Sequence, residues 1–269
     1  MFKRLQSWRR QRVLAQSPLR DRLWRRVIAD RPLFDGLTDG ELSRLKDLAV
    51  LLLREKDIHG AAGQAIDDNV RITIAAQACL PILNLGLDYY KGWIEVIVYP
   101  EQFVPLREYV DEAGVVHQTR HPLAGESWLG GPLILSWEDA SYVDDGAGVN
   151  VVIHEFAHKL DMLNGDVNGF PPLHADMRRE RWASAFSAAY DGFCSAVDRG
   201  EEPRIDPYAS ESPAEFFAVM SEAFFEIPVV LKKQYPDVYA QLALFYRQDP
   251  VRRRPAATLS SDPLSTGAE

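Results

Sequence analysis

The sequence has little cysteine and no long apolar run. Its 269 residues include only two cysteines, Cys79 and Cys194, which make no disulfide framework and favour a reducing, cytoplasmic location. No stretch approaches the ~18 apolar residues that a membrane-spanning helix requires, so no transmembrane segment is expected. A Walker A loop and a G-x-G-x-x-G pattern are also missing, so nucleotide binding has no support. These absences leave an ordinary soluble globular protein.

Positive charge is concentrated at one end of the chain. Residues 1–26 carry nine Lys or Arg and one acid, a net charge of +8; the whole chain carries −9, which leaves −17 on the rest. The segment lacks the apolar centre of a signal peptide, and an organellar transit peptide is the weaker alternative. We predict that residues 1–36 form a basic arm that folds back on the acidic body. Contact with a membrane surface, nucleic acid or an acidic partner is the alternative, with no direct nucleic-acid binding expected.

Hydrophobic periodicity predicts an α+β domain over residues 37–249. Thr38 and Glu41 have the spacing of a capping box, and apolar positions at helical spacing follow from Leu42 to Leu53. Further helices are predicted over residues 68–80, 149–163, 174–198, 212–226 and 234–247. Strands are predicted over 93–100 and 130–137, with a hairpin over 107–119. The polar end, residues 250–269, is predicted to be a disordered tail.

Two histidines four residues apart, His154 and His158, lie in the segment VVIHEFAHKLDMLNG (151–165). Apolar residues at spacings of three and four predict a helix with one core face: Val149, Val152, Ile153, Phe156, Leu160 and Leu163. Both imidazoles then lie on one side and can reach one zinc ion at about 2.0–2.1 Å. Glu155 lies about 100° round the helix, where it can act as a general base on a metal-bound water. A chance match on an exposed helix is the alternative, expected in on the order of one chain in a hundred.

A zinc enzyme needs a third protein ligand. Asp161 and Asn164 stand where the H-E-x-x-H-x-x-G-x-x-H class has glycine and histidine, which excludes that class. A carboxylate from the helix over 212–226 is the other solution, and Glu215 and Glu222 both lie along its edge. Glu215 also fits a capping box with Ser212, so spacing leaves the two glutamates equal. The remaining histidines are expected at the surface: His59, His117, His121 and His174.

The segments HEFAHKLDMLNG and PYASESPAEFFAVMSEAFFE, preceded by GGPLILSW, resemble the Mlc titration factor A family over most of the chain. These are bacterial zinc peptidases of the gluzincin group. The resemblance implies His154, His158 and Glu215 as zinc ligands, Glu155 as catalytic base and Tyr208 as a transition-state stabiliser. It further implies a zincin-like catalytic domain similar to that of anthrax lethal factor. Aminopeptidase-like activity, and regulation of sugar uptake through binding of the glucose-responsive repressor Mlc, are also implied.

Three functions are therefore compared. The first is a cytoplasmic zinc peptidase that acts on peptides or proteins, with Glu155 taking a proton from a metal-activated water and Tyr208 donating to the developing oxyanion. The second is a non-catalytic regulator that sequesters a transcription factor and holds zinc for structural reasons. The presence of Glu155 favours the peptidase, because a structural zinc site needs no general base. The third is a zinc hydrolase with a non-peptide substrate. Asp161 either orients a ligand histidine or is exposed, and strand 132–137 is either a substrate-binding sheet edge or a core strand.

Overall fold

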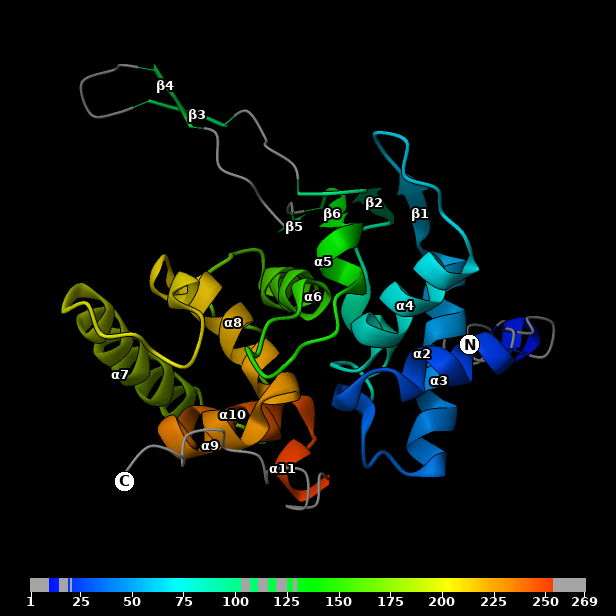
Figure 1. The fold of residues 1–269 in the computed structure, drawn as a ribbon. Helices are drawn as coiled ribbons and strands as arrows, with labels where there is room; N and C mark the ends of the chain where they lie inside the picture. The colour runs from blue at the N-terminus through cyan, green and yellow to red at the C-terminus, as the bar shows by residue number, and fades with distance from the viewer. Residues whose placement is uncertain are drawn as a thin grey trace, which may run out of the picture.

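The computed structural model describes residues 10–14, 19, 21–102, 107–110, 116–119, 125–127 and 130–253. Figure 1 shows a small sheet beside a larger set of helices, an α+β arrangement, as predicted. The helices are α2 Asp21–Ala29, α3 Asp39–Glu55, α4 Asp68–Cys79, α5 Trp137–Ser141, α6 Val151–Asp161, α7 Arg179–Asp198, α8 Pro213–Glu226, α9 Pro228–Gln234, α10 Pro236–Tyr246 and α11 Pro250–Arg253. Short 3-10 turns are η1 Pro32–Phe34, η2 Leu87–Tyr90, η3 Met162–Asn164 and η4 Pro207–Ser210. The strands are β1 Asp57–Gly60, β2 Glu95–Tyr99, β3 Arg107–Val110, β4 Val116–Thr119, β5 Gly125–Ser127 and β6 Leu133–Ser136.

The main sheet has the order β1-β2-β6-β5. Strands β1, β2 and β6 run parallel, and β5 pairs antiparallel with β6 through the register Glu126↔Ile134. Of the two alternatives for strand 132–137, the core strand is confirmed and the sheet edge is excluded, because β6 is paired on both sides and Leu133 and Leu135 are fully buried. The two edge strands of the sheet are β1 and β5. Neither strand was predicted from the sequence.

The predicted hairpin over 107–119 is confirmed. Strands β3 and β4 pair antiparallel, with Arg107 opposite Thr119 and Val110 opposite Val116. Figure 1 shows this pair at the upper left, away from the four-stranded sheet and the helices. The backbone of the hairpin therefore projects from the rest of the domain.

The helix predictions hold in most places and fail at several boundaries. The capping box before α3 is confirmed: Glu41 N donates to Thr38 Oγ1 at 3.3 Å, and Thr38 N donates to Glu41 Oε2 at 2.9 Å. The predicted helix over 174–198 begins only at Arg179. The predicted helix over 234–247 begins at Pro236, because a proline is tolerated only in the first turn, and a separate α9 precedes it. None of the helices in the described part of the chain has the length and apolar composition to cross a bilayer.

Residues on both sides of the predicted domain, 37–249, pack with its core. Trp24, Val27 and Phe34 are at most 5% exposed and belong to the core, so residues 21–36 are part of the domain and not of an arm. Arg10 lies 2.8 Å from Asp88, an ion pair between the basic segment and the acidic body. Residues 250–253 form α11 instead of a disordered tail, and Arg253 donates to Leu33 O at 3.0 Å. Residues 1–9 and 254–269 lie outside the described residues.

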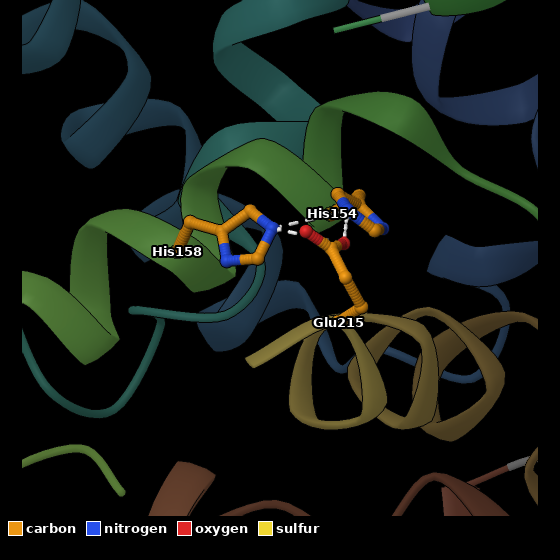
Figure 2. Close-up of side chains that lie close together, drawn as sticks. All are labelled: His154, His158 and Glu215. Carbon is orange, nitrogen blue, oxygen red and sulfur yellow. Dashed lines mark hydrogen bonds and ion pairs between the residues drawn. The ribbon is translucent and has the colours of Figure 1, made fainter. Parts of the chain in front are cut away.

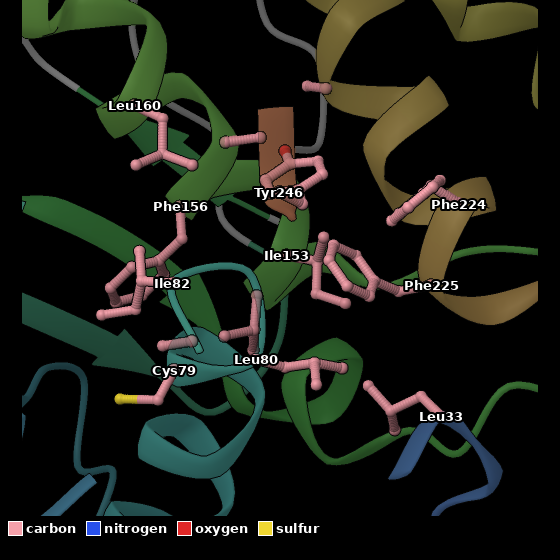
Figure 3. Close-up of a cluster of buried hydrophobic side chains, with 14 of the residues drawn as sticks. Leu33, Cys79, Leu80, Ile82, Ile153, Phe156, Leu160, Phe224, Phe225 and Tyr246 are labelled. Atoms are coloured by element: carbon pink, nitrogen blue, oxygen red, sulfur yellow. The ribbon is translucent and has the colours of Figure 1, made fainter. Parts of the chain in front are cut away.

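Helix α6 lies at the centre of the core. Every residue from 151 to 161 is buried, and Figure 3 shows α6 side chains between those of α4, α8 and α10. The Phe156 ring packs edge-on against Tyr90 with centroids 4.9 Å apart. Val149 and Leu163, predicted on the core face, lie just beyond the ends of α6 and are 38% and 36% exposed. Contact on all sides holds α6 rigidly, and with it the histidines that it carries.

Candidate metal centre

The first turn of α6 is fixed by a side-chain cap. Asn150 is the N-cap residue, and its Oδ1 accepts from Ile153 N at 3.0 Å, which satisfies one of the free amides at the helix start. The next turn presents His154, and the turn after it His158, with 8% and 7% of each residue exposed. The Nε2 atoms of both rings face Glu215 of α8.

Three side chains from two helices meet at one point (Figure 2). His154 Nε2 lies 2.9 Å from Glu215 Oε2, and His158 Nε2 lies 3.3 Å from the same oxygen. The two Nε2 atoms are 3.1 Å apart. One ligand atom from each residue lies within 4.8 Å of the others, an arrangement able to hold a metal ion. The structure thus brings together the three residues predicted as metal ligands.

The glutamate choice left open by spacing has a geometric answer. Ser212 Oγ accepts from Glu215 N at 3.1 Å, so the cap on α8 forms. The Glu215 carboxylate, however, reaches the two histidines instead of closing the second half of a capping box. Glu222 lies on the far side of the ring, with Oε1 2.7 Å from His154 Nδ1. Glu215 therefore faces the candidate metal position, and Glu222 faces the back of His154.

The charges of the cluster favour a cation between these groups. Burial lowers the pKa of His154, but Glu222 and Glu215 outweigh it and raise that pKa well above its usual value. Burial raises the pKa of Glu215, and hydrogen bonds from His154 and His158 more than reverse this, so its pKa lies well below its usual range. If His154 Nδ1 donates to Glu222, Nε2 carries a lone pair and faces another acceptor, Glu215 Oε2. A proton or a metal ion resolves that mismatch, so the donor set fits a bound cation.

Glu155 lies between α6 and the edge strand β5. The residue is 4% exposed, and Ser127 Oγ donates to its backbone oxygen at 3.0 Å. A Cβ added at Gly125 would lie 2.5 Å from Glu155 Cγ and Oε1, so the glycine allows the strand to approach this carboxylate. Burial raises the pKa of Glu155. Among the described residues Oε2 has no hydrogen-bond partner, so it is available to accept a proton.

The cleft extends on both sides of His154 and Glu155. A cavity of about 160 Å³ lies on the side of His158 and Glu215 and is also lined by Met162 and Val167. A second cavity, of about 230 Å³, is lined by residues of the loops and helices opposite: Val149, Val151, Asp206, Val219 and Glu222. The two cavities share Gly125, His154, Glu155 and Tyr208, so they adjoin at these residues.

Tyr208 lines both cavities. It lies on η4, where its backbone N donates to Asp206 Oδ1 at 2.9 Å, and 44% of the residue is exposed. Its ring centroid is 6.0 Å from that of His154. The Tyr208 side chain therefore lies at the cleft, beside His154.

Two of the other sequence expectations are corrected. Asp161 is fully buried, and its Oδ2 accepts from Asn168 N at 2.8 Å and Gly169 N at 2.7 Å. Asp161 is therefore neither exposed nor bonded to His158; it fixes the loop after α6. His174 is half-buried and linked to Phe245 O at 2.8 Å, so its placement at the surface was wrong. His59 is exposed, as predicted, whereas the His117 side chain and His121 lie outside what the structure describes.

Sequence reasoning missed several groups around the cluster. Strand β5, with Gly125 and Ser127, is too short to produce a periodic pattern. Lys159 was not singled out; its Nζ donates to Gly131 O at 3.0 Å, and burial lowers its pKa to about 8. Asn150 was also overlooked, although an Asn directly before the first apolar residue of a helix is a known start signal.

Comparison with known proteins identifies the family of the chain. Residues 5–247 match the family model described as glucose-regulated metallo-peptidase M90. Mlc titration factor A of Cronobacter sakazakii is 38% identical over 248 residues, which cover 91% of this chain and 92% of the relative. The protein of the same name from Salmonella arizonae is 40% identical over 251 residues, 91% of this chain and 97% of the relative. That of Escherichia coli strain 55989 is 38% identical over 224 residues, 82% and 84% of the two chains. The resemblance read from the motifs is confirmed, and the chain belongs to the M90 family of glucose-regulated metallo-peptidases.

Proposed function

We propose that this protein is a zinc-dependent peptidase of the gluzincin type. The observation that carries the proposal is the meeting of His154, His158 and Glu215, with Glu155 in the lining of the same cavity. A structural metal site has no need of a base, so a buried Glu155 oxygen without a partner among the described residues supports catalysis. The position of α6 next to a small sheet with β5 at its edge supports a zincin-like fold.

Zinc is the proposed metal because the donor set and spacing suit it. Two imidazoles and one carboxylate, with the fourth position open, are the usual ligands of catalytic zinc. Bonds of about 2.0–2.1 Å in a tetrahedron separate the ligand atoms by about 3.3 Å. The three separations here are 2.9, 3.1 and 3.3 Å. Small outward movements of the side chains are therefore sufficient for zinc to bind.

The proposed mechanism assigns one task to each side chain. His154, His158 and Glu215 would hold the zinc ion, which would supply activation of a water molecule and polarisation of a peptide carbonyl. Glu155 accepts a proton at Oε2, and its burial makes it a stronger base than an exposed glutamate. Tyr208 donates a hydrogen bond to the carbonyl oxygen as negative charge develops there. Glu155 then returns the proton to the leaving amine.

The edge strand β5 is the proposed support for the substrate. An extended peptide adds to a sheet edge through main-chain hydrogen bonds. Strand β5 borders the cavity through Gly125, Glu126 and Ser127, which places that edge beside Glu155. Peptides or proteins are therefore the proposed substrates, with aminopeptidase-like cleavage as the family resemblance implies.

Metal analysis and a substrate panel test this function on wild type and Glu155→Gln. We expect about one zinc per chain in both proteins. Hydrolysis of aminoacyl and peptide substrates is expected in the wild type and should fall by about 10²–10⁴-fold in Glu155→Gln. A zinc-loaded wild type that hydrolyses none of the panel would favour the non-catalytic regulator, and turnover of non-peptide esters alone would favour the third function.

A second proposed function is binding of a Mlc-like transcriptional repressor, in the cytoplasm. Its support is the name Mlc titration factor A carried by relatives that are 38–40% identical. A protein interface depends on surface anchors and not on a catalytic base, so Glu155→Gln should retain repressor affinity while it loses hydrolysis. Deletion of residues 1–9 tests the basic segment, because deletion of all of residues 1–26 would also remove buried Trp24. Parallel loss of binding and hydrolysis in Glu155→Gln would instead mean that the repressor occupies the catalytic cleft.

A further inference from the structure

A buried polar junction joins the start of α6 to α8 and α4. Glu222 is 5% exposed, and its two carboxylate oxygens have different partners. Oε1 lies 2.7 Å from His154 Nδ1, and Oε2 accepts a hydrogen bond from Asn150 N. Glu222 thus bridges the backbone at the start of α6 and the ring carried one turn later.

We propose that Glu222, held by Asn150, is the positioning residue that fixes the ring of His154 with Nδ1–H toward α8 and the Nε2 lone pair toward the metal. The inference rests on the proposed metal centre, because it assigns His154 as a ligand. A partner on the outer nitrogen of a ligand histidine sets the ring orientation and raises its basicity. Glu222 has this position, whereas the Glu215 oxygen lies on the Nε2 side.

A carboxylate is required at position 222 because both of its neighbours donate. Asn150 contributes a backbone N–H, and His154 contributes Nδ1–H. A glutamine has one carbonyl oxygen and one NH₂ group, so it can accept from only one of them. Its NH₂ group would face either the Asn150 amide or the His154 Nδ1–H, and a buried donor facing a donor is costly. The isosteric change Glu222→Gln therefore breaks the bridge without leaving a cavity.

The Asn150 side chain anchors the bridge to the rest of the core. Its Nδ2 donates to Gln77 Oε1 at 2.8 Å and to Glu226 Oε1 at 2.7 Å. Gln77 Nε2 in turn donates to the backbone oxygen of Ala140, in α5, at 3.0 Å. The junction therefore connects α4, α5, α6 and α8 at the residue that caps the metal-binding helix. In this network each of these donors has an acceptor. A fully satisfied buried network is rigid, so it holds the Glu222 carboxylate in one position.

The test uses the full chain as wild type, Glu222→Gln and the matched control Glu211→Gln, which makes the same chemical change at an exposed position near the start of α8. Zinc affinity is measured by competition with a chromophoric chelator. Proton NMR of the zinc-bound proteins reports His154 Nδ1–H, which a carboxylate partner shifts downfield and protects from exchange. We expect Glu222→Gln to bind zinc about 10–100-fold more weakly and to lose the downfield signal. The control should match the wild type in both measurements.

The outcomes separate this inference from the proposed function. Zinc affinity of Glu222→Gln within twofold of the wild type, with the Nδ1–H signal unchanged, would overturn the positioning role and leave the metal centre intact. A wild type that binds no zinc would overturn both. If Glu222→Gln does not fold, the wild type still decides: a zinc-bound protein without a protected, downfield His154 Nδ1–H would refute the bridge.

Discussion

The contact between Gly125 and Glu155 makes a sharp prediction for the substitution Gly125→Ala. The new Cβ would lie 2.5 Å from Glu155 Cγ and Oε1 and 2.7 Å from Cδ. Carbon atoms in contact are about 3.5–4.0 Å apart, so the carboxylate or β5 must move by about 1 Å. Gly125 has no positive φ, so alanine introduces no backbone strain there. Displacement of Glu155 or of the strand is thus the main expected effect.

We expect Gly125→Ala to lower kcat/KM by about 10²-fold, since a 1 Å misplacement of a catalytic group can cost that much. Zinc content and the far-ultraviolet circular dichroism spectrum should remain those of the wild type. The matched control is Gly192→Ala in α7, where an added Cβ meets nothing within 4 Å. It should retain full activity and unfold at a slightly higher temperature, because alanine favours a helix by about 1 kcal/mol over glycine. A Gly125→Ala protein with wild-type kcat/KM would refute the role given to this contact, and loss of zinc with activity would locate the damage at the metal ligands.

Three further predictions concern the metal and the base. Glu155→Gln should keep its zinc and fold while kcat/KM falls by about 10²–10⁴-fold; near-wild-type turnover in a zinc-loaded sample would exclude Glu155 as the base. His158→Ala and Glu215→Ala should each lose zinc on dialysis, and Glu215→Ala should lose it more readily than Glu222→Ala; the reverse order by metal analysis would restore Glu222 as the ligand. In the metal-free protein burial raises the pKa of Glu155 above the usual 4.5, so an NMR titration of its carboxylate in that form should have a midpoint above pH 4.5. A midpoint at or below 4.5 would contradict this effect of burial on Glu155.

The features that the sequence by itself determined are local ones. The capping box at Thr38, the helix that carries His154 and His158, and the cap at Ser212 depend on residues three or four apart, which a helix brings together wherever it lies. The same holds for the hairpin over 107–119, whose strands are neighbours in the chain. Candidate ligands and a candidate base could therefore be named before any fold was known.

Only the tertiary structure decided how distant segments meet. Sequence spacing alone does not distinguish Glu215 from Glu222 as the third ligand. In the structure, the packing of α8 against α6 places Glu215 beside His154 Nε2 and Glu222 beside Nδ1. Strand β5 has three residues and no pattern of its own, yet it becomes the sheet edge because β6 offers it a partner. The basic composition of the first residues predicted an arm, although Trp24 is buried in the core. Its burial depends on contact with other elements of the core, among them α3 and α4. These outcomes depend on contacts between residues far apart in the chain, and local periodicity carries no information about such contacts.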